Sequence, residues 1–334
     1  MTGSVAPTAP PAGQGVPSTG ARLARVAQRQ GALVILVVAV LAATFAFDSF
    51  GTRGNLTNIG LQASFLAVVA LGMTFVIMTG GIDLSVGSVF ALGGVLAAWG
   101  AQYGTWAALL VPLLVCGAIG LAQGLIIARG GLPPFIVTLA GLLFARGVLL
   151  LISDEGATTY KVPVESAFRT LSQGSLLGIG FPIWLVVIAF VLGGIVLHRT
   201  SYGATVLAIG GQEDAADLMG LPVVRTKIIA YVTSGLLAGF GGMLMASYTS
   251  SGVTVLGVGM ELEAIAAVVL GGTLLTGGAG TVLGTLVGVL LLQVIMNVIN
   301  QVGSLNSNWQ AVVSGTILLV VVTLQQWLAK VQRR

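Results

Sequence analysis

The stretch GLQASFLAVVALGMTFVIMTGGIDLSVGSVFALGGVLAAW, residues 60–99, decides the fold class of this chain. It holds two apolar runs, 60–79 and 84–99, and Asp83 between them is its one charged residue. A membrane-spanning helix needs about 17 to 25 mostly apolar residues. The first run therefore predicts a spanning helix. The second has 16 residues and internal glycines, which predicts a short, broken or re-entrant helix.

Apolar runs of this kind recur along the whole chain. Of its 334 residues, 56% are apolar and 7% are charged, whereas a soluble domain carries about 25% charged residues. The mean hydropathy of +1.04 agrees. We predict an all-α polytopic membrane protein of about ten helices, over residues 31–47, 60–79, 84–99, 106–128, 134–152, 181–197, 226–246, 261–276, 280–299 and 310–328.

The distribution of positive charge predicts how the chain is oriented. With the N-terminus in the cytoplasm, ten Lys and Arg residues fall inside and three outside, as the positive-inside rule requires. Both termini and the loop 198–225 are then cytoplasmic, and the loop 153–180 is periplasmic. Residues 1–21 hold four prolines and no charged side chain, which predicts a disordered tail before a transmembrane domain over 22–334.

Residues that carry enzymatic chemistry are scarce. None of the three lysines follows a glycine, so no phosphate-binding loop of the Gly-Lys-Ser/Thr kind is present. The single histidine, His198, lies at a predicted cytoplasmic helix end, and the single cysteine, Cys116, lies in an apolar run. Basic residues are scattered, which does not favour nucleic-acid binding. We predict no enzymatic activity, no metal site and no resident cofactor.

The cytoplasmic loop contains the signals of a short helix. Glycines at 210 and 211 precede a run of helix formers, which Gly220 and Pro222 end. The predicted helix of about two turns has an apolar and an acidic side, and it is too short to be stable alone. It packs either on its own protein or on a cytoplasmic partner. The apolar side comprises Ala215, Ala216, Leu218 and Met219, and the acidic side Glu213, Asp214 and Asp217.

Several polar residues interrupt the apolar segments. Asp83 precedes a short helix, where it can cap exposed amides or serve transport. Arg146 either extends outward to the membrane surface or lines a path for solute. Three amide side chains share one helix face, those of Gln293, Asn297 and Asn300. There they either line a path for solute or bond to neighbouring helices.

Glycines four residues apart predict close helix contacts. They occur at 117, 120 and 124, at 235 and 239, and at 280, 284 and 288. We interpret them as packing positions.

The third and eighth segments resemble each other. The eighth also has 16 residues interrupted by glycine, which predicts a short, broken or re-entrant helix there too. When the chain is shifted by 178 residues, Asp83 falls on Glu261, and six of 14 aligned positions agree. Five spans separate the two segments, so a repeat of this length is inverted in the membrane. We predict two inverted five-helix halves, with Asp83 toward the cytoplasm and Glu261 toward the outside, each beside a helix N-terminus.

The chain resembles the permease subunit of bacterial ABC importers for monosaccharides, of the ribose and galactose type. The resemblance runs from about Leu56 to Leu328, and four sequence motifs that occur there in order carry it. The shorter motifs Phe144-Ala145-Arg146-Gly147, Ser153-Asp154-Glu155 and Gly271-Gly272-Thr273-Leu274-Leu275 look most like a galactofuranose permease subunit. The four motifs are Gly80-Gly81-Ile82-Asp83-Leu84-Ser85-Val86-Gly87, Pro134-Phe135-Ile136-Val137-Thr138-Leu139, Ala208-Ile209-Gly210-Gly211 and Glu261-Leu262-Glu263-Ala264-Ile265-Ala266-Ala267-Val268-Val269-Leu270-Gly271-Gly272.

The resemblance implies an inner-membrane assembly of two permease subunits, identical or different, a cytoplasmic ATPase that binds ATP, and a periplasmic or lipid-anchored sugar-binding protein. It implies that a coupling helix contacts the ATPase, formed by Gly211, Gln212, Glu213, Asp214, Ala215, Ala216, Asp217, Leu218, Met219 and Gly220. For the sugar path in the membrane we select Asp83, Ser85, Phe135, Arg146, Glu261, Gln293, Asn297 and Asn300.

Two other classes of protein compete with this interpretation. A secondary transporter driven by an ion gradient also uses broken helices and carboxylates near the membrane centre, but it does not need a helix that docks on an ATPase. A structural membrane scaffold predicts that the amides at 293, 297 and 300 are silent in uptake assays.

Overall fold

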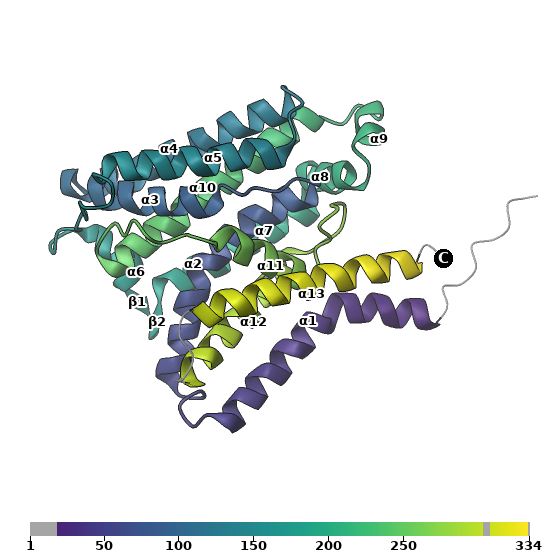
Figure 1. Ribbon diagram of the computed structural model, residues 1–334, viewed down its shortest axis with the longest axis horizontal. Helices are drawn as coiled ribbons and strands as arrows, with labels where there is room; N and C mark the ends of the chain where they lie inside the picture. Colours follow the sequence, from purple (N-terminus) through teal and green to yellow (C-terminus); the bar gives the residue numbers. More distant parts are fainter. Residues whose placement is uncertain (1–18, 303–307, 333–334) are drawn as a thin grey trace, which may run out of the picture.

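The computed structural model describes residues 19–302 and 308–332, and these residues form a helical bundle (Figure 1). The long helices and one short apolar helix follow the predicted segments in order. They are α1 (Thr19–Ala46), α2 (Arg53–Met78), α3 (Val86–Gly100), α4 (Thr105–Ala128), α5 (Pro134–Ile152), α7 (Phe181–Arg199), α10 (Val223–Thr249), α11 (Met260–Leu270), α12 (Val282–Val302) and α13 (Asn308–Gln332).

Among the described residues, seven helices are long and apolar enough to cross a membrane, if α3 is counted together with the short 3-10 helix Ala101–Tyr103 that continues it. The polytopic, all-α class is therefore confirmed, whereas ten spans in two halves stay a prediction. The eighth segment is short, as predicted, but its bounds 261–276 were too long, because α11 ends at Leu270 and turns fill the chain up to α12. Gly272, Gly277 and Gly278 in these turns have positive φ, which a helix does not allow. With 11 residues, α11 is about 16 Å long, too short to span.

The two long loops are structured. The loop 153–180 holds α6 (Thr170–Gln173) and a small hairpin of two two-residue strands, β1 (Ser175–Leu176) and β2 (Ile179–Gly180). The other loop holds α8 (Ser201–Gly211), which the sequence analysis did not predict, and α9 (Glu213–Leu218). The N-terminal tail was predicted to extend to residue 21, but α1 already begins at Thr19, and residues 1–18 lie outside the described part.

Helix α10 is the centre of the bundle and packs on α2, α3 and α4. Glycines allow the close approach, as the four-residue spacing predicted. A Cβ atom at Gly124 would lie 3.0 Å from Cα of Ile228, and one at Gly235 would lie 2.5 Å from the carbonyl oxygen of Cys116. Both positions need glycine because backbone, which cannot move aside like a side chain, faces them.

The bundle has two distinct ends. At one end lie α9, the start of α1 and the end of α13 (Figure 1). At the other end lie α6, β1 and β2, and the loop there is fixed to the end of α10. The hydroxyl of Ser247 donates to the carbonyl oxygen of Phe168 at 2.8 Å, and the amide of Ser172 donates to Ser247 Oγ at 3.0 Å. The first residues of α1 and the last residues of α13 therefore lie at the same end of the bundle as α9, opposite to this loop.

Candidate functional site

Asp83 lies at the start of α3 and is enclosed by three segments. Its exposed fraction is 1%. Oδ1 accepts hydrogen bonds from the amide and the hydroxyl of Ser85, at 3.0 and 2.6 Å. Oδ2 accepts one from the hydroxyl of Ser234 on α10, at 2.7 Å. Gln123 of α4 completes the shell, because its Oε1 accepts a bond from Ser85 Oγ at 3.3 Å. The carboxylate thus joins α3, α4 and α10.

A glycine brings a further polar atom to this cluster. The hydroxyl of Tyr231, on α10, lies directly against Gly81, where a Cβ atom would collide with it. Tyr231 is 1% exposed and interacts electrostatically with Asp83. The structure therefore encloses Asp83 and Ser85 instead of exposing them along an open passage. Their selection as path residues stays a prediction for another conformation.

Arg146 of α5 turns toward the extended segment before α11. Its Nη1 donates to the carbonyl oxygen of Thr254 at 2.8 Å, and its Nη2 donates to that of Leu256 at 3.3 Å. Its guanidinium attracts the carboxylate of Glu261, although among the described residues no ion pair joins the two. Arg146 therefore fixes the segment that leads into α11.

Helices α3 and α11 meet at their N-terminal ends and run in opposite directions. A Cβ atom at Gly87 would collide with the carbonyl oxygen of Gly257 and with the Glu261 carboxylate. The far end of α3 packs near Val162 and Phe168 in the loop 153–180. The turns after the far end of α11 instead contact the end of α2 and Gly80, which begins the link between α2 and α3. These opposite directions are what an inverted pair requires, while the position of each carboxylate across a membrane stays a prediction.

The three amides of α12 have different surroundings, although they share a helix face. Asn297 is bonded in both directions to Asn55 of α2, at 2.8 and 3.1 Å, and it accepts a bond from Gln301. Asn300 is exposed and accepts a bond from Gln310 of α13. Gln293 is half-buried, and no side-chain hydrogen bond joins it to the described residues. The geometry favours a helix-bonding role for Asn297.

Leucine at Asn297 should destabilise the protein more than leucine at Gln293. The first change removes both bonds to Asn55 and leaves its amide with only the carbonyl oxygen of Phe50, which lowers the free energy of unfolding by about 1–2 kcal/mol. The second removes no bond within the described residues and should change it by less than about 0.5 kcal/mol. Thermal unfolding of the two variants in detergent measures the difference. Equal losses would contradict the helix-bonding role.

Helix α9 is held on one side and free on the other. Ala216 is 1% exposed and packs with Ile209 and Val223, whereas Leu218 is 89% and Met219 69% exposed. The sequence predicted that these apolar side chains share one side, but the structure divides them, because Ala216 and Leu218 are two residues apart and so point to nearly opposite sides of the helix. The exposed pair leaves an apolar surface at the end of the bundle.

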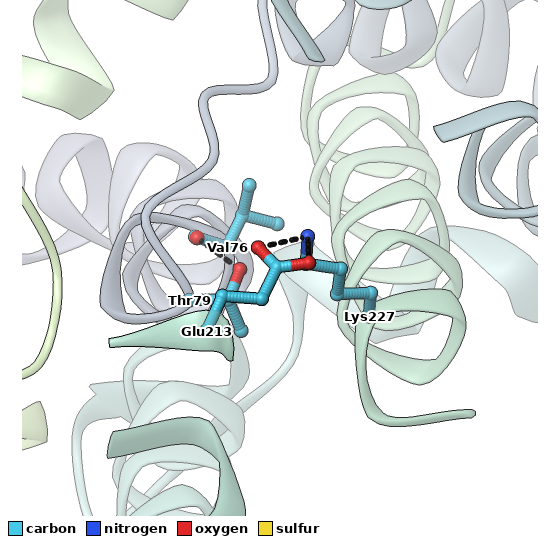
Figure 2. Close-up of polar contacts among 4 residues, drawn as sticks. All are labelled: Val76, Thr79, Glu213 and Lys227. Atoms are coloured by element: carbon cyan, nitrogen blue, oxygen red, sulfur yellow. Dashed lines mark hydrogen bonds and ion pairs between the residues drawn. The ribbon is translucent and has the colours of Figure 1, made fainter. Parts of the chain in front are cut away.

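An ion pair fixes the start of α9 to α10. Lys227 Nζ donates to both carboxylate oxygens of Glu213 at 2.5 Å. Figure 2 draws this pair together with the hydrogen bond from Thr79 Oγ1 to the carbonyl oxygen of Val76, at the end of α2. The remaining selected path residue, Phe135, is 56% exposed in the first turn of α5.

Two helices that meet at their N-terminal ends, with Asp83 before one and Glu261 in the first turn of the other, lie inside an apolar bundle, an arrangement typical of membrane transport proteins. Comparison with known proteins gives the family. Residues 55–322 match the model described as "Branched-chain amino acid transport system / permease component". The chain belongs to this permease family, whose members are transport components and not enzymes.

Curated relatives align over nearly their whole length. The inner membrane ABC transporter permease protein YjfF of Escherichia coli K12 is 42% identical, over 88% of this chain and 90% of that protein. The ribose import permease protein RbsC of the same strain is 39% identical, over 88% and 92%. The L-arabinose ABC transporter permease protein AraH of Azospirillum brasilense is 36% identical, over 90% and 88%. No solved structure matches.

Proposed function

We propose that this chain is the membrane subunit of an ATP-driven importer that carries a monosaccharide across the bacterial inner membrane. The observation that carries the proposal is the similarity to permeases named for ribose and arabinose import, which covers about nine-tenths of both partners. The family description names amino acids, whereas two of the three relatives given above are named for ribose and L-arabinose. Both termini and α9 face the cytoplasm, in line with the excess of positive charge at that end.

The ATPase docks on α9 and the residues beside it, 211–220. The exposed apolar side chains of Leu218 and Met219 support this assignment, because α9 buries only Ala216 against its own protein. Such a short helix gains stability from a second partner. ATP is bound by that partner, and this chain carries no cofactor of its own.

The sugar path runs beside α5, α11 and α12. Arg146 and Glu261 place donors and acceptors of hydrogen bonds within an apolar bundle, where each is only partly buried. Hydroxyl-rich solutes need both kinds of group. Gln293 and Asn300 offer further amides, and Phe135 offers an apolar ring at one end of α5.

Further partners complete the importer. A second permease subunit, identical or different, pairs with this one, and a periplasmic or lipid-anchored binding protein delivers the sugar. Membrane lipid covers the outer faces of α5 and α7, where Leu143, Leu151 and Ile188 are exposed. Galactofuranose is the sugar that we propose, from the resemblance of residues 144–147, 153–155 and 271–275 to a galactofuranose permease subunit.

Reconstitution in proteoliposomes tests the proposal. The chain is combined with the ATPase and the binding protein of the same bacterium, and uptake of radiolabelled galactofuranose, ribose and arabinose is compared. We expect uptake of one sugar that depends on ATP and on the binding protein. Liposomes that contain the chain without the ATPase are the control. Uptake by these control liposomes under a proton or sodium gradient would overturn the proposal in favour of a secondary transporter.

A further inference from the structure

Three glycine pairs from distant parts of the chain meet beside the start of α9. They are Gly80-Gly81 after α2, Gly210-Gly211 at the end of α8 and Gly277-Gly278 between α11 and α12. We call the group of Gly80, Gly210, Gly277 and Gly278 the glycine junction. Three of the six glycines, at 80, 277 and 278, have positive φ. This conformation is strained for residues with a side chain.

The contacts in the glycine junction are between backbones. A Cβ atom at Gly210 would collide with the carbonyl oxygen of Met78 and the amide of Gly278. One at Gly277 would lie 2.7 Å from the amide nitrogen of Gly80 and 2.9 Å from Cα of Gly210. The amide of Gly278 donates to the carbonyl oxygen of Met78 at 3.0 Å, so it satisfies a carbonyl that the end of α2 leaves free.

Each segment of the junction leads to an element of the proposed mechanism. Gly210 lies two residues before Gln212, where α9 starts. Gly80 is followed by the link that carries Asp83 into α3. Gly277 and Gly278 follow α11 in the turn that closes on α12, in which the amide of Leu274 donates to the carbonyl oxygen of Ala279 at 3.0 Å. A displacement of α8 therefore presses directly on the chain next to both short helices.

We propose that the glycine junction transmits the movement of α9 to α3 and α11 together. The proposal rests on the proposed function, in which the ATPase moves α9. Backbone contacts without intervening side chains leave no soft group to absorb the displacement, because close-packed interiors transmit strain. The competing route runs from α9 through Leu221 and Val223 into α10, since the amide of Leu221 donates to the carbonyl oxygen of Ala216.

A matched pair of alanine variants separates the junction from a glycine outside it. Gly210→Ala pushes a methyl group into Met78 and Gly278, whereas Gly194→Ala in α7 meets nothing within 4 Å. In the reconstituted complex, Gly210→Ala should lower sugar uptake per ATP hydrolysed by about tenfold, a coupling loss within the usual range. The ATPase should stay bound, and Gly194→Ala should behave as the wild type.

A second variant keeps the test independent of folding defects at Gly210. Two glycines inserted between Gly211 and Gln212 leave the glycine junction intact. They make the connection between the junction and α9 longer and more flexible. We expect the same loss of uptake per ATP. Wild-type uptake per ATP in this variant, with the ATPase bound, would overturn the proposal and assign transmission to α10.

Hydrogen exchange distinguishes failure of this inference from failure of the proposed function. In the wild-type complex, nucleotide binding to the ATPase should change amide exchange in both 79–85 and 274–281. Gly210→Ala should abolish both changes, and Gly194→Ala neither. A wild-type complex that hydrolyses ATP but imports no sugar contradicts the proposed function, while the exchange pattern still decides the role of the junction. Unchanged exchange in both segments of the wild type would contradict that role.

Discussion

Leu218→Asp should detach the ATPase from the permease and lower ATP-driven uptake by about 100-fold. Leu218 is 89% exposed, so the protein itself does not need it for packing. In the proposed assembly its side chain is buried in the ATPase, and burial of a leucine contributes about 1.5–3 kcal/mol. A carboxylate at this position must also lose its water without a partner. Co-purification of the ATPase and uptake in proteoliposomes measure the effect.

Leu177→Asp is the matched control. Leu177 is 83% exposed, but it lies between β1 and β2 at the opposite end of the bundle. This variant should retain the ATPase. A proline at Ala216 tests the same helix differently, because it removes the hydrogen bond from the amide of Ala216 to the carbonyl oxygen of Gln212. Full ATPase binding by Leu218→Asp, with the protein folded, would disprove docking on α9.

Asp83→Ala should be the most destabilising single substitution near the short helices. It leaves the hydroxyl of Ser234 without its acceptor, and that of Ser85 with only Oε1 of Gln123 at 3.3 Å, in a region that excludes water. Each unsatisfied buried donor costs about 1–3 kcal/mol, so we expect a loss of about 2–4 kcal/mol in the free energy of unfolding. Thermal unfolding in detergent should show a clearly lower midpoint. Asp83→Asn, which keeps one acceptor oxygen, should lose less.

Asp217→Ala provides the control for Asp83→Ala. Asp217 is an exposed carboxylate in α9, and its substitution removes no buried hydrogen bond. Its unfolding midpoint should match the wild type. If Asp83→Ala unfolds at the same temperature as Asp217→Ala but loses sugar uptake, then Asp83 serves the path and not the packing of α3 on α4 and α10.

Hydropathy was enough to locate the helices. Every predicted segment contains a helix, because a window of about 20 apolar residues has no other way to satisfy its backbone in lipid. The same reasoning failed at α11, where the apolar run continues past Leu270 but Gly271 and Gly272 end the helix. It also missed α8, whose residues 201–211 pack on α2 and α10 without a long apolar run.

The sequence by itself determined the membrane class, the order of the segments, the short helix after residue 211 and the family. Only the tertiary structure decided which groups each polar residue bonds to. Ser234 meets Asp83 across 151 residues of chain, and Asn55 meets Asn297 across 242. The physical reason is that apolar character is a local property of each segment, whereas a hydrogen-bond partner depends on how distant helices pack. For the same reason, three glycine pairs that look alike in sequence become one junction only in the folded bundle.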